Sequence, residues 1–209
     1  MGLRLNLGCG RDLRPGHLNV DIHVPKDLPP TCQFLQADLS QLPWPWADGS
    51  ADSVMMLDFL EHFPYRYTGK VLAEAWRVLV PDGTLEVQVP DFTECARAVL
   101  QDQDGFLCNR CGHQFDSWLQ ASIEGACPKC SQKLSDLAEA AIHRLYGGQD
   151  VRGNWHHTAF TESVLHRHLE SCGFDRIETV ELNENGETHR QNWNIKLVAR
   201  KGALSWEEP

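Results

Sequence analysis

The sequence predicts an α/β fold in which a mostly parallel sheet carries a small inserted domain. Apolar and polar residues alternate over residues 3–7, which then lead into Gly8-Cys9-Gly10, a pattern typical of a strand that ends in a tight turn. A continuous apolar run at residues 54–57 is typical of a parallel strand covered on both faces. Between residues 105 and 133 this regular pattern stops, and two Cys-x-x-Cys pairs occur instead.

Length and charge narrow the class of protein. The chain of 209 residues is long enough for one full α/β domain with a modest addition. Its 19 basic and 29 acidic residues give a net charge of −10, which argues against a nucleic-acid partner. No apolar run approaches the roughly 20 residues that cross a bilayer, and no signal-peptide pattern opens the sequence. We therefore expect a cytoplasmic protein without a membrane partner.

The first strand and the next one predict a nucleoside pocket. Two glycines, Gly8 and Gly10, let a ligand approach bare backbone. Asp21, near the end of the second predicted strand, can accept hydrogen bonds from both hydroxyls of a ribose. Leu13 stands where a dinucleotide fingerprint would have its third glycine, and no phosphate-binding Gly-Lys-Ser/Thr follows. The pattern favours S-adenosylmethionine over NAD or ATP, with an ordinary strand-to-loop turn as the alternative.

The remaining elements follow in chain order. Only ten residues separate Gly10 from Asp21, so we expect the first crossover helix to be shortened to about one turn. The tryptophans of residues 43–46 are expected to pack over the sheet edge or, alternatively, to line a substrate mouth. Further strands are predicted at residues 33–36, 52–57, 85–89, 176–182 and 192–200. Helices are predicted at 68–79, where Pro81-Asp82-Gly83 stops the helix, and at 134–145, where Gly147-Gly148 ends it. Another helix is expected after a capping box at Asp91 and Glu94, and a last one from Thr161 to Gly173.

Five motifs in order carry a family resemblance: Leu5-Asn6-Leu7-Gly8-Cys9-Gly10, Val20-Asp21-Ile22, Ala37-Asp38-Leu39, residues 57–62 and residues 77–85. Together they resemble the class I S-adenosylmethionine-dependent methyltransferases, and among them the type 11 group. The resemblance covers about residues 3–91 and resumes from about 154 to 200. It implies a Rossmann-like, doubly wound sheet of seven strands, six parallel and one reversed, with helices on both faces and an antiparallel hairpin at the edge.

The resemblance also assigns the site for S-adenosyl-L-methionine and its product, S-adenosyl-L-homocysteine. It implies that Asp38 hydrogen-bonds the adenine amino group; a cap on the turn before Ser40 is a compatible role. Asp58 and Glu61 could orient either the methionine amino group or an acceptor hydroxyl. The predicted cofactor-binding residues are Asn6, Gly8, Cys9, Gly10, Asp21, Ile22, Asp38, Leu39, Leu57, Asp58 and Glu61.

Histidines are the candidate catalytic groups. Methyl transfer from a sulfonium is an in-line displacement, and a hydroxyl acceptor needs a base with a pKa near neutral. His62 lies at the tip of the predicted fourth strand, and His156 and His157 lie in a loop expected at the same sheet edge. The alternative for each is a cap or a hydrogen bond to a loop. We predict O-methylation of a small hydroxylated acceptor; the resemblance alone suggests a sugar or glycan unit.

Two other functions fit the same motifs. One is a protein or nucleic-acid methyltransferase that docks its target through the inserted segment. If such an enzyme methylated nitrogen, the transfer would need less help from a base than transfer to a hydroxyl. The other is a cofactor-binding scaffold without turnover that works through dimer contacts. Retained cofactor binding with loss of activity on replacing His62 or His157 would distinguish an enzyme from a scaffold.

The inserted segment has the spacing of a four-thiolate zinc ribbon. Cys108-x-x-Cys111 and Cys127-x-x-Cys130 are separated by fifteen residues. Four cysteine ligands leave no open coordination position, so we predict a structural Zn²⁺ that supplies folding free energy. The insert is interpreted as a substrate-side lid or an oligomer contact, and a homodimer is one outcome. The predicted domains are a methyltransferase domain at 1–104 and 134–201, the ribbon at 105–133 and a tail at 202–209.

Overall fold

The computed structural model describes residues 2–101, 106–107, 114–115, 127–129, 137–150, 153–180 and 193–202. The chain divides into two compact units, one made of Met1–Pro90 and His157–Pro209 and the other of Asp91–His156. The predicted insert, residues 105–133, falls inside the second unit and lies mostly outside the described residues. Its boundaries therefore stay a prediction.

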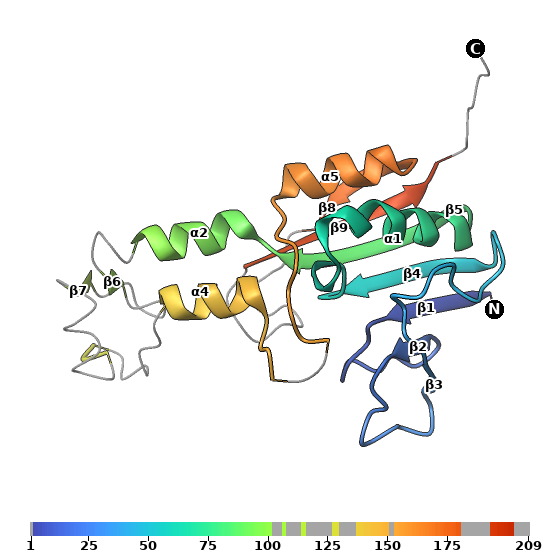
Figure 1. Cartoon of the computed structure of the whole chain (residues 1–209), viewed down its shortest axis with the longest axis horizontal. Coiled ribbons are helices and arrows are strands. Elements are labelled where there is room, and N and C mark those ends of the chain that lie inside the picture. Colours follow the sequence, from blue (N-terminus) through green and yellow to red (C-terminus); the bar gives the residue numbers. More distant parts are fainter. Residues whose placement is uncertain are drawn as a thin grey trace, which may run out of the picture. The chain divides into compact units, whose positions relative to one another are not determined.

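The first unit is built on a seven-stranded sheet in the order β3-β2-β1-β4-β5-β9-β8 (Figure 1). Neighbouring strands from β3 to β5 are parallel, whereas β9 runs antiparallel to both β5 and β8. The prediction of six parallel strands, one reversed strand and an antiparallel edge pair is confirmed. The strands are β1 (Leu3–Leu7), β2 (Leu18–Asp21), β3 (Gln33–Gln36), β4 (Ala51–Leu57), β5 (Leu79–Pro90), β8 (Phe174–Thr179) and β9 (Asn194–Lys201).

Helices of this unit flank its later strands. The short helix η1 (Leu60–His62) and α1 (Tyr65–Val78) join β4 to β5, and α5 (Glu162–Ser171) precedes β8. The Thr161 side chain accepts a hydrogen bond from the Val164 N–H, so the predicted N-cap of α5 is confirmed. The helix predicted at residues 68–79 is confirmed as α1, which begins three residues earlier, at Tyr65. The helix already ends at Val78, because Leu79 takes an extended conformation and begins β5 beside Ala51.

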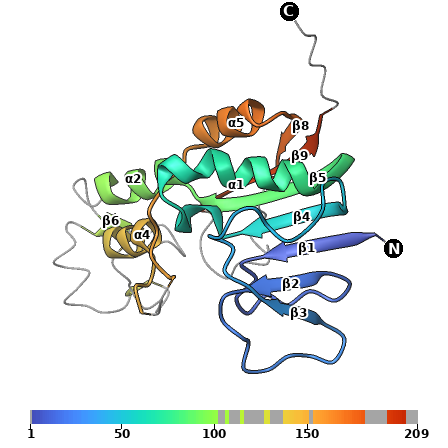
Figure 2. The ribbon, with the colours of Figure 1, turned by 45° about the vertical axis from the view of Figure 1, so that its right-hand side comes forward.

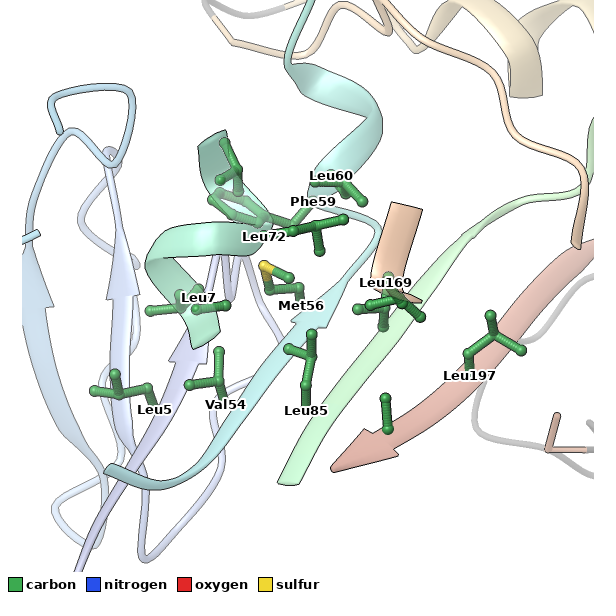
Figure 3. Packing of buried hydrophobic residues seen from close by; sticks show 14 of the residues in the cluster. Leu5, Leu7, Val54, Met56, Phe59, Leu60, Leu72, Leu85, Leu169 and Leu197 are labelled. Carbon is green, nitrogen blue, oxygen red and sulfur yellow. The ribbon is translucent and has the colours of Figure 1, made fainter. Parts of the chain in front are cut away.

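One face of the sheet carries the apolar core. Alternate residues of the central strands point to this face and are fully buried, and α1 and α5 cover them with their own apolar residues (Figure 3). Burying each such side chain contributes about 1.5–3 kcal/mol. Both helices lie on this same side of the sheet (Figure 2). Residues of this core include Leu5, Leu7, Val54, Met56, Val71, Leu72, Leu85, Val87, Leu165, Leu169 and Leu197.

The opposite face of the sheet is polar. Asn6, Asn19 and Gln88 are buried there, and Glu86 pairs with Lys196 across β5 and β9 at 2.6 Å. The expected helices on both faces are therefore found on one face only in the described part of this unit. The connections between β1 and β2 and between β2 and β3, residues 8–17 and 22–32, contain turns and no helix, so the predicted single helical turn after Gly10 is absent.

The tryptophan loop packs instead of opening onto a mouth. Trp44 is buried in the core, and Trp46 meets it edge-on at 6.1 Å between ring centroids. The Arg77 guanidinium donates to the Trp44 and Trp46 carbonyls and pairs with Glu74 and Asp48. Its hydrogen bond holds the pKa of Glu74 below the usual value. Arg77 thus anchors the loop to α1.

The second unit contains the packed helices α2 (Phe92–Gln101) and α4 (Leu137–Tyr146), and the strands β6 (Phe106–Leu107) and β7 (Gln114–Phe115) pair antiparallel. Both predicted helices are confirmed. Asp91 caps α2 by accepting from the Thr93 N–H at 2.8 Å, whereas Glu94 pairs with Arg97. None of the helices in the described ranges is both long and apolar enough to span a membrane.

Of the four predicted zinc ligands, Cys108, Cys111 and Cys130 lie outside the described residues. The fourth, Cys127, is buried. The zinc site therefore stays a prediction.

Candidate functional site

The predicted site residues gather at one edge of the sheet. The glycine turn follows β1, Asp21 ends β2, Asp38 follows β3 and Asp58 follows β4. These four strands are parallel, so their carboxyl ends lie at the same edge. Strand order reverses between β1 and β4, which is the position where open α/β sheets bind ligands.

The glycine turn is held against β2 and against an aromatic ring. The Gly8 and Cys9 N–H groups both donate to the Val20 carbonyl, at 2.8 and 3.1 Å. Gly8 and Gly10 take φ values of +65° and +51°, in the left-handed region that glycine adopts readily. A Cβ on Gly8 would lie 2.2 Å from Cδ2 of Phe59. Gly8 is therefore required by its contact as well as by its backbone angle.

The thiol of Cys9, between the two glycines, is unreactive. Cys9 is buried. Burial, and after it the nearby Asp21 carboxylate, raise the pKa of the Cys9 thiol to about 12. The thiol therefore stays protonated at neutral pH and is a poor nucleophile.

The Asp21 carboxylate is oriented by two backbone donors. Its Oδ2 accepts from the Gly10 N–H at 2.9 Å, and its Oδ1 accepts from the His23 N–H at 2.8 Å. Each carboxylate oxygen has two lone pairs, so each retains one acceptor direction. Two adjacent hydroxyl groups could be bound in this way without moving the side chain. Ile22, half-buried, stands beside it.

Asn6 lies beneath the turn, within the sheet. Its Nδ2 donates to the Asp12 carbonyl at 2.7 Å and to Oδ1 of Asn19 at 2.9 Å, and the residue is 2% exposed. Both N–H donors of the Asn6 side chain are thus used within the protein, and its predicted contact with the cofactor stays a prediction.

Asp38 has the turn-capping role that the sequence allowed. Its Oδ1 accepts from the Ser40 N–H at 3.0 Å and from the Ser40 hydroxyl at 2.6 Å. Leu39 is buried in the core, and its carbonyl accepts from Nε1 of Trp44. Capping fixes the Asp38 side chain at the sheet edge, and its adenine contact stays a prediction.

Asp58 combines backbone strain with a polar cradle. It follows half-buried Leu57 at the tip of β4 and has φ +50°, a conformation that costs a non-glycine residue about 1–3 kcal/mol and is concentrated at functional sites. Nε2 of Gln88 lies 3.3 Å from its Oδ2, and Nδ2 of Asn194 lies 3.4 Å from its Oδ1. Sequence analysis did not single out these two amides. A polar residue between Val87 and Val89 was the available signal for Gln88.

The backbone segments that carry His62 and His157 are held together. The Glu61 carbonyl accepts from the N–H groups of His157 and Thr158, at 2.8 and 3.2 Å. The Thr158 hydroxyl donates to the Phe63 carbonyl at 2.7 Å. The segment after His157 is therefore tied to η1, which carries buried Glu61 and half-buried His62, while His157 is exposed. Sequence analysis missed Thr158, which nothing local distinguishes.

The third histidine belongs to the second unit. Nδ1 of His156 lies 2.9 Å from the Arg144 carbonyl. A carbonyl only accepts, so Nδ1 carries the proton in this hydrogen bond. This is the loop contact considered as the alternative role, and a catalytic role for His156 stays a prediction.

The arrangement suits a nucleoside without a diphosphate. Bare backbone at Gly10, where nothing lies within 4 Å of a Cβ, and a fixed carboxylate at Asp21 can hold a ribose. A pyrophosphate is usually held by the N–H groups of a helix N-terminus. Residues 8–17, all of which the structure describes, form no helix and offer no such terminus.

Comparison with known proteins agrees with this geometry. The model of the methyltransferase domain family matches residues 5–87, which run from β1 into β5. No curated protein matches the sequence.

Solved structures resemble the chain in fold. The 1,6-didemethyltoxoflavin-N1-methyltransferase of Burkholderia thailandensis, solved with S-adenosylhomocysteine, is 17% identical with a TM-score of 0.53, over 97% of this chain and 72% of that one. A SAM-dependent methyltransferase of Methanosarcina mazei is 17% identical with a TM-score of 0.51, over 96% and 92%. The CurJ carbon methyltransferase is 12% identical with a TM-score of 0.53, over 97% of this chain, which spans 49% of that one. These likenesses show a methyltransferase fold.

Replacing Gly8 with alanine should destabilise the protein more than replacing Gly10. Both substitutions force alanine into the left-handed region, at a cost of about 1–2 kcal/mol. Only Gly8→Ala also drives a Cβ into the Phe59 ring, whereas nothing lies within 4 Å of a Cβ on Gly10. Urea unfolding of both variants measures the difference. Equal losses would show that the Phe59 contact does not constrain this turn.

Proposed function

We propose that the chain is an S-adenosyl-L-methionine-dependent methyltransferase. The observation that carries the proposal is the Asp21 carboxylate, which the Gly10 and His23 N–H groups orient beside a glycine turn. The family match over residues 5–87 and the methyltransferase fold support it. When bound, the cofactor supplies a methyl group on a sulfonium sulfur.

The protein's own residues would divide the binding between them. The backbone of residues 8–10 lies against the ligand, and Asp21 accepts from the ribose hydroxyls. Asp38 accepts from the adenine amino group, while Asp58 and Glu61 face the cationic amino group of the methionine part. Ile22 and Leu57, both half-buried, supply apolar surface for the adenine ring and the methionine chain, whereas Leu39 packs in the core.

We propose a small hydroxylated compound as the acceptor. In-line transfer requires that the acceptor oxygen be held opposite the leaving sulfur, which the rigid sheet edge and the tied segment at Thr158 support. The hydroxyl proton must leave as the new bond forms. His157 and His62 are the candidate bases, since the Glu61 carbonyl holds the two segments that carry them together.

The intact protein should bind S-adenosylhomocysteine, and Asp21→Ala should weaken this binding by at least about tenfold. The substitution removes hydrogen bonds to a charged acceptor, each worth about 1.5–3 kcal/mol. Isothermal titration calorimetry measures both affinities. Asp27→Ala is the matched control, because Asp27 is an exposed carboxylate in the loop after β2. An intact protein that does not bind S-adenosylhomocysteine would overturn the proposed function.

His157→Ala or His62→Ala should lower methyl transfer by about 100-fold while the affinity for S-adenosylhomocysteine stays unchanged. The assay follows the tritiated methyl group of S-adenosylmethionine into a panel of monosaccharides and phenols. His143→Ala is the control, since His143 is exposed on α4. Full activity in both variants would exclude His62 and His157 as the base and leave the cofactor assignment intact.

We also propose that Cys108, Cys111, Cys127 and Cys130 hold one structural zinc ion. The purified full chain should then contain about one zinc per molecule, and Cys127→Ser should lose it. Inductively coupled plasma mass spectrometry measures the metal. Cys32→Ser, which replaces a buried cysteine of the first unit, should retain it. A chain purified without chelator that carries no zinc would contradict the proposal.

A further inference from the structure

The connection from β1 to β2 lacks the helix that usually joins parallel strands. Such crossovers generally take a dozen or more residues, and here residues 8–17 make the whole connection. A loop that crosses a sheet must still satisfy its backbone N–H and C=O groups. A helix would do this internally, so this loop needs partners from elsewhere.

Two asparagines supply those partners. Asn6 of β1 and Asn19 of β2 are register neighbours on the polar face, 2% and 0% exposed. Nδ2 of Asn6 donates to Oδ1 of Asn19 at 2.9 Å and to the Asp12 carbonyl at 2.7 Å. The two amides are thus joined to one another as well as to the loop.

Asn19 makes most of the loop contacts. Its Oδ1 accepts from the Arg14 N–H at 2.8 Å. Its Nδ2 lies 3.1 Å from the Arg14 carbonyl and 3.3 Å from the His17 carbonyl. The same Nδ2 donates at 2.9 Å to the Gln33 carbonyl of β3, so one side chain connects the loop to the neighbouring strand. A buried amide at this position replaces the internal hydrogen bonds of a helix.

We infer that Asn6 and Asn19 form an asparagine latch that positions the glycine turn for its ligand. The latch holds residues 12–14, and the Asp12 N–H donates to the Cys9 carbonyl at 2.8 Å. The Gly10 N–H between them points to Oδ2 of Asp21. The latch therefore sets the orientation of the Asp21 carboxylate, the group predicted to bind the ribose. Asn6 acts as a positioning residue and not as a cofactor contact.

The loop held by the latch also limits which ligands the turn accepts. Residues 8–17 form no helix, so no helix N-terminus points at the site to stabilise a diphosphate. The bound group is then a nucleoside whose 5′ substituent carries no diphosphate. This inference rests on the proposed function for its ligand, but the latch itself can be measured without one.

The test compares Asn6→Ala and Asn19→Ala with the intact chain. Amide hydrogen exchange at Arg14 should become at least about tenfold faster in both variants, while exchange in the centre of β4 stays unchanged. Affinity for S-adenosylhomocysteine should fall by at least about tenfold. If Asn19→Ala does not fold, Asn6→Ala decides, because it leaves the Arg14 contact to Asn19 in place and removes only the bracing amide.

Two controls separate positioning from general stability. Val71→Ala removes core volume beneath α1, so it should lower stability and keep the affinity. Gln41→Ala removes an exposed amide and should change neither. Unchanged exchange at Arg14 in both latch variants would overturn the latch. Faster exchange with unchanged affinity would overturn its positioning role. An intact chain that fails to bind S-adenosylhomocysteine but shows the exchange effect would overturn the ligand assignment and keep the latch.

Discussion

Burial of one apolar sheet face beneath α1 and α5 is the constraint on which the rest of this structure depends. Side chains alternate between faces along a strand, so a slip of one residue would move the buried set of that strand to the polar face. The register pairs Leu5 with Val54 and Val54 with Leu85, all fully buried. Because this register is fixed, the ends of β1, β2, β3 and β4 are fixed as well, and the site is built on those ends.

The polar face of the sheet is covered without helices in the part of the first unit that the structure describes. A doubly wound sheet normally covers both faces with helices, whose backbone groups are satisfied internally. Here the first connections are too short for helices, and buried amides at Asn6 and Asn19 satisfy the loop backbone instead. This difference has a chemical consequence at the sheet edge, because the loop of residues 8–17 offers no helix N-terminus to a ligand.

Strain and close contact are concentrated at the tips of the strands. Gly8 has a positive φ and touches the Phe59 ring, and Phe59 in turn meets Phe63 edge-on at 5.0 Å. The Phe63 carbonyl accepts a hydrogen bond from the Thr158 hydroxyl. A continuous series of contacts therefore connects the glycine turn with the segment that carries His157.

The sequence by itself determined the features that depend on near neighbours in the chain. Alternation and apolar runs predicted the strands, the glycine pair predicted the turn, and Asp21 followed from its place at the end of a short strand. The tertiary structure alone decided which distant groups complete the site. Gln88 and Asn194 reach Asp58 from 30 and 136 residues away, and Thr158 reaches Phe63 from 95 residues away. Such pairs leave no spacing pattern, because only the folding of the whole chain brings them within hydrogen-bonding distance.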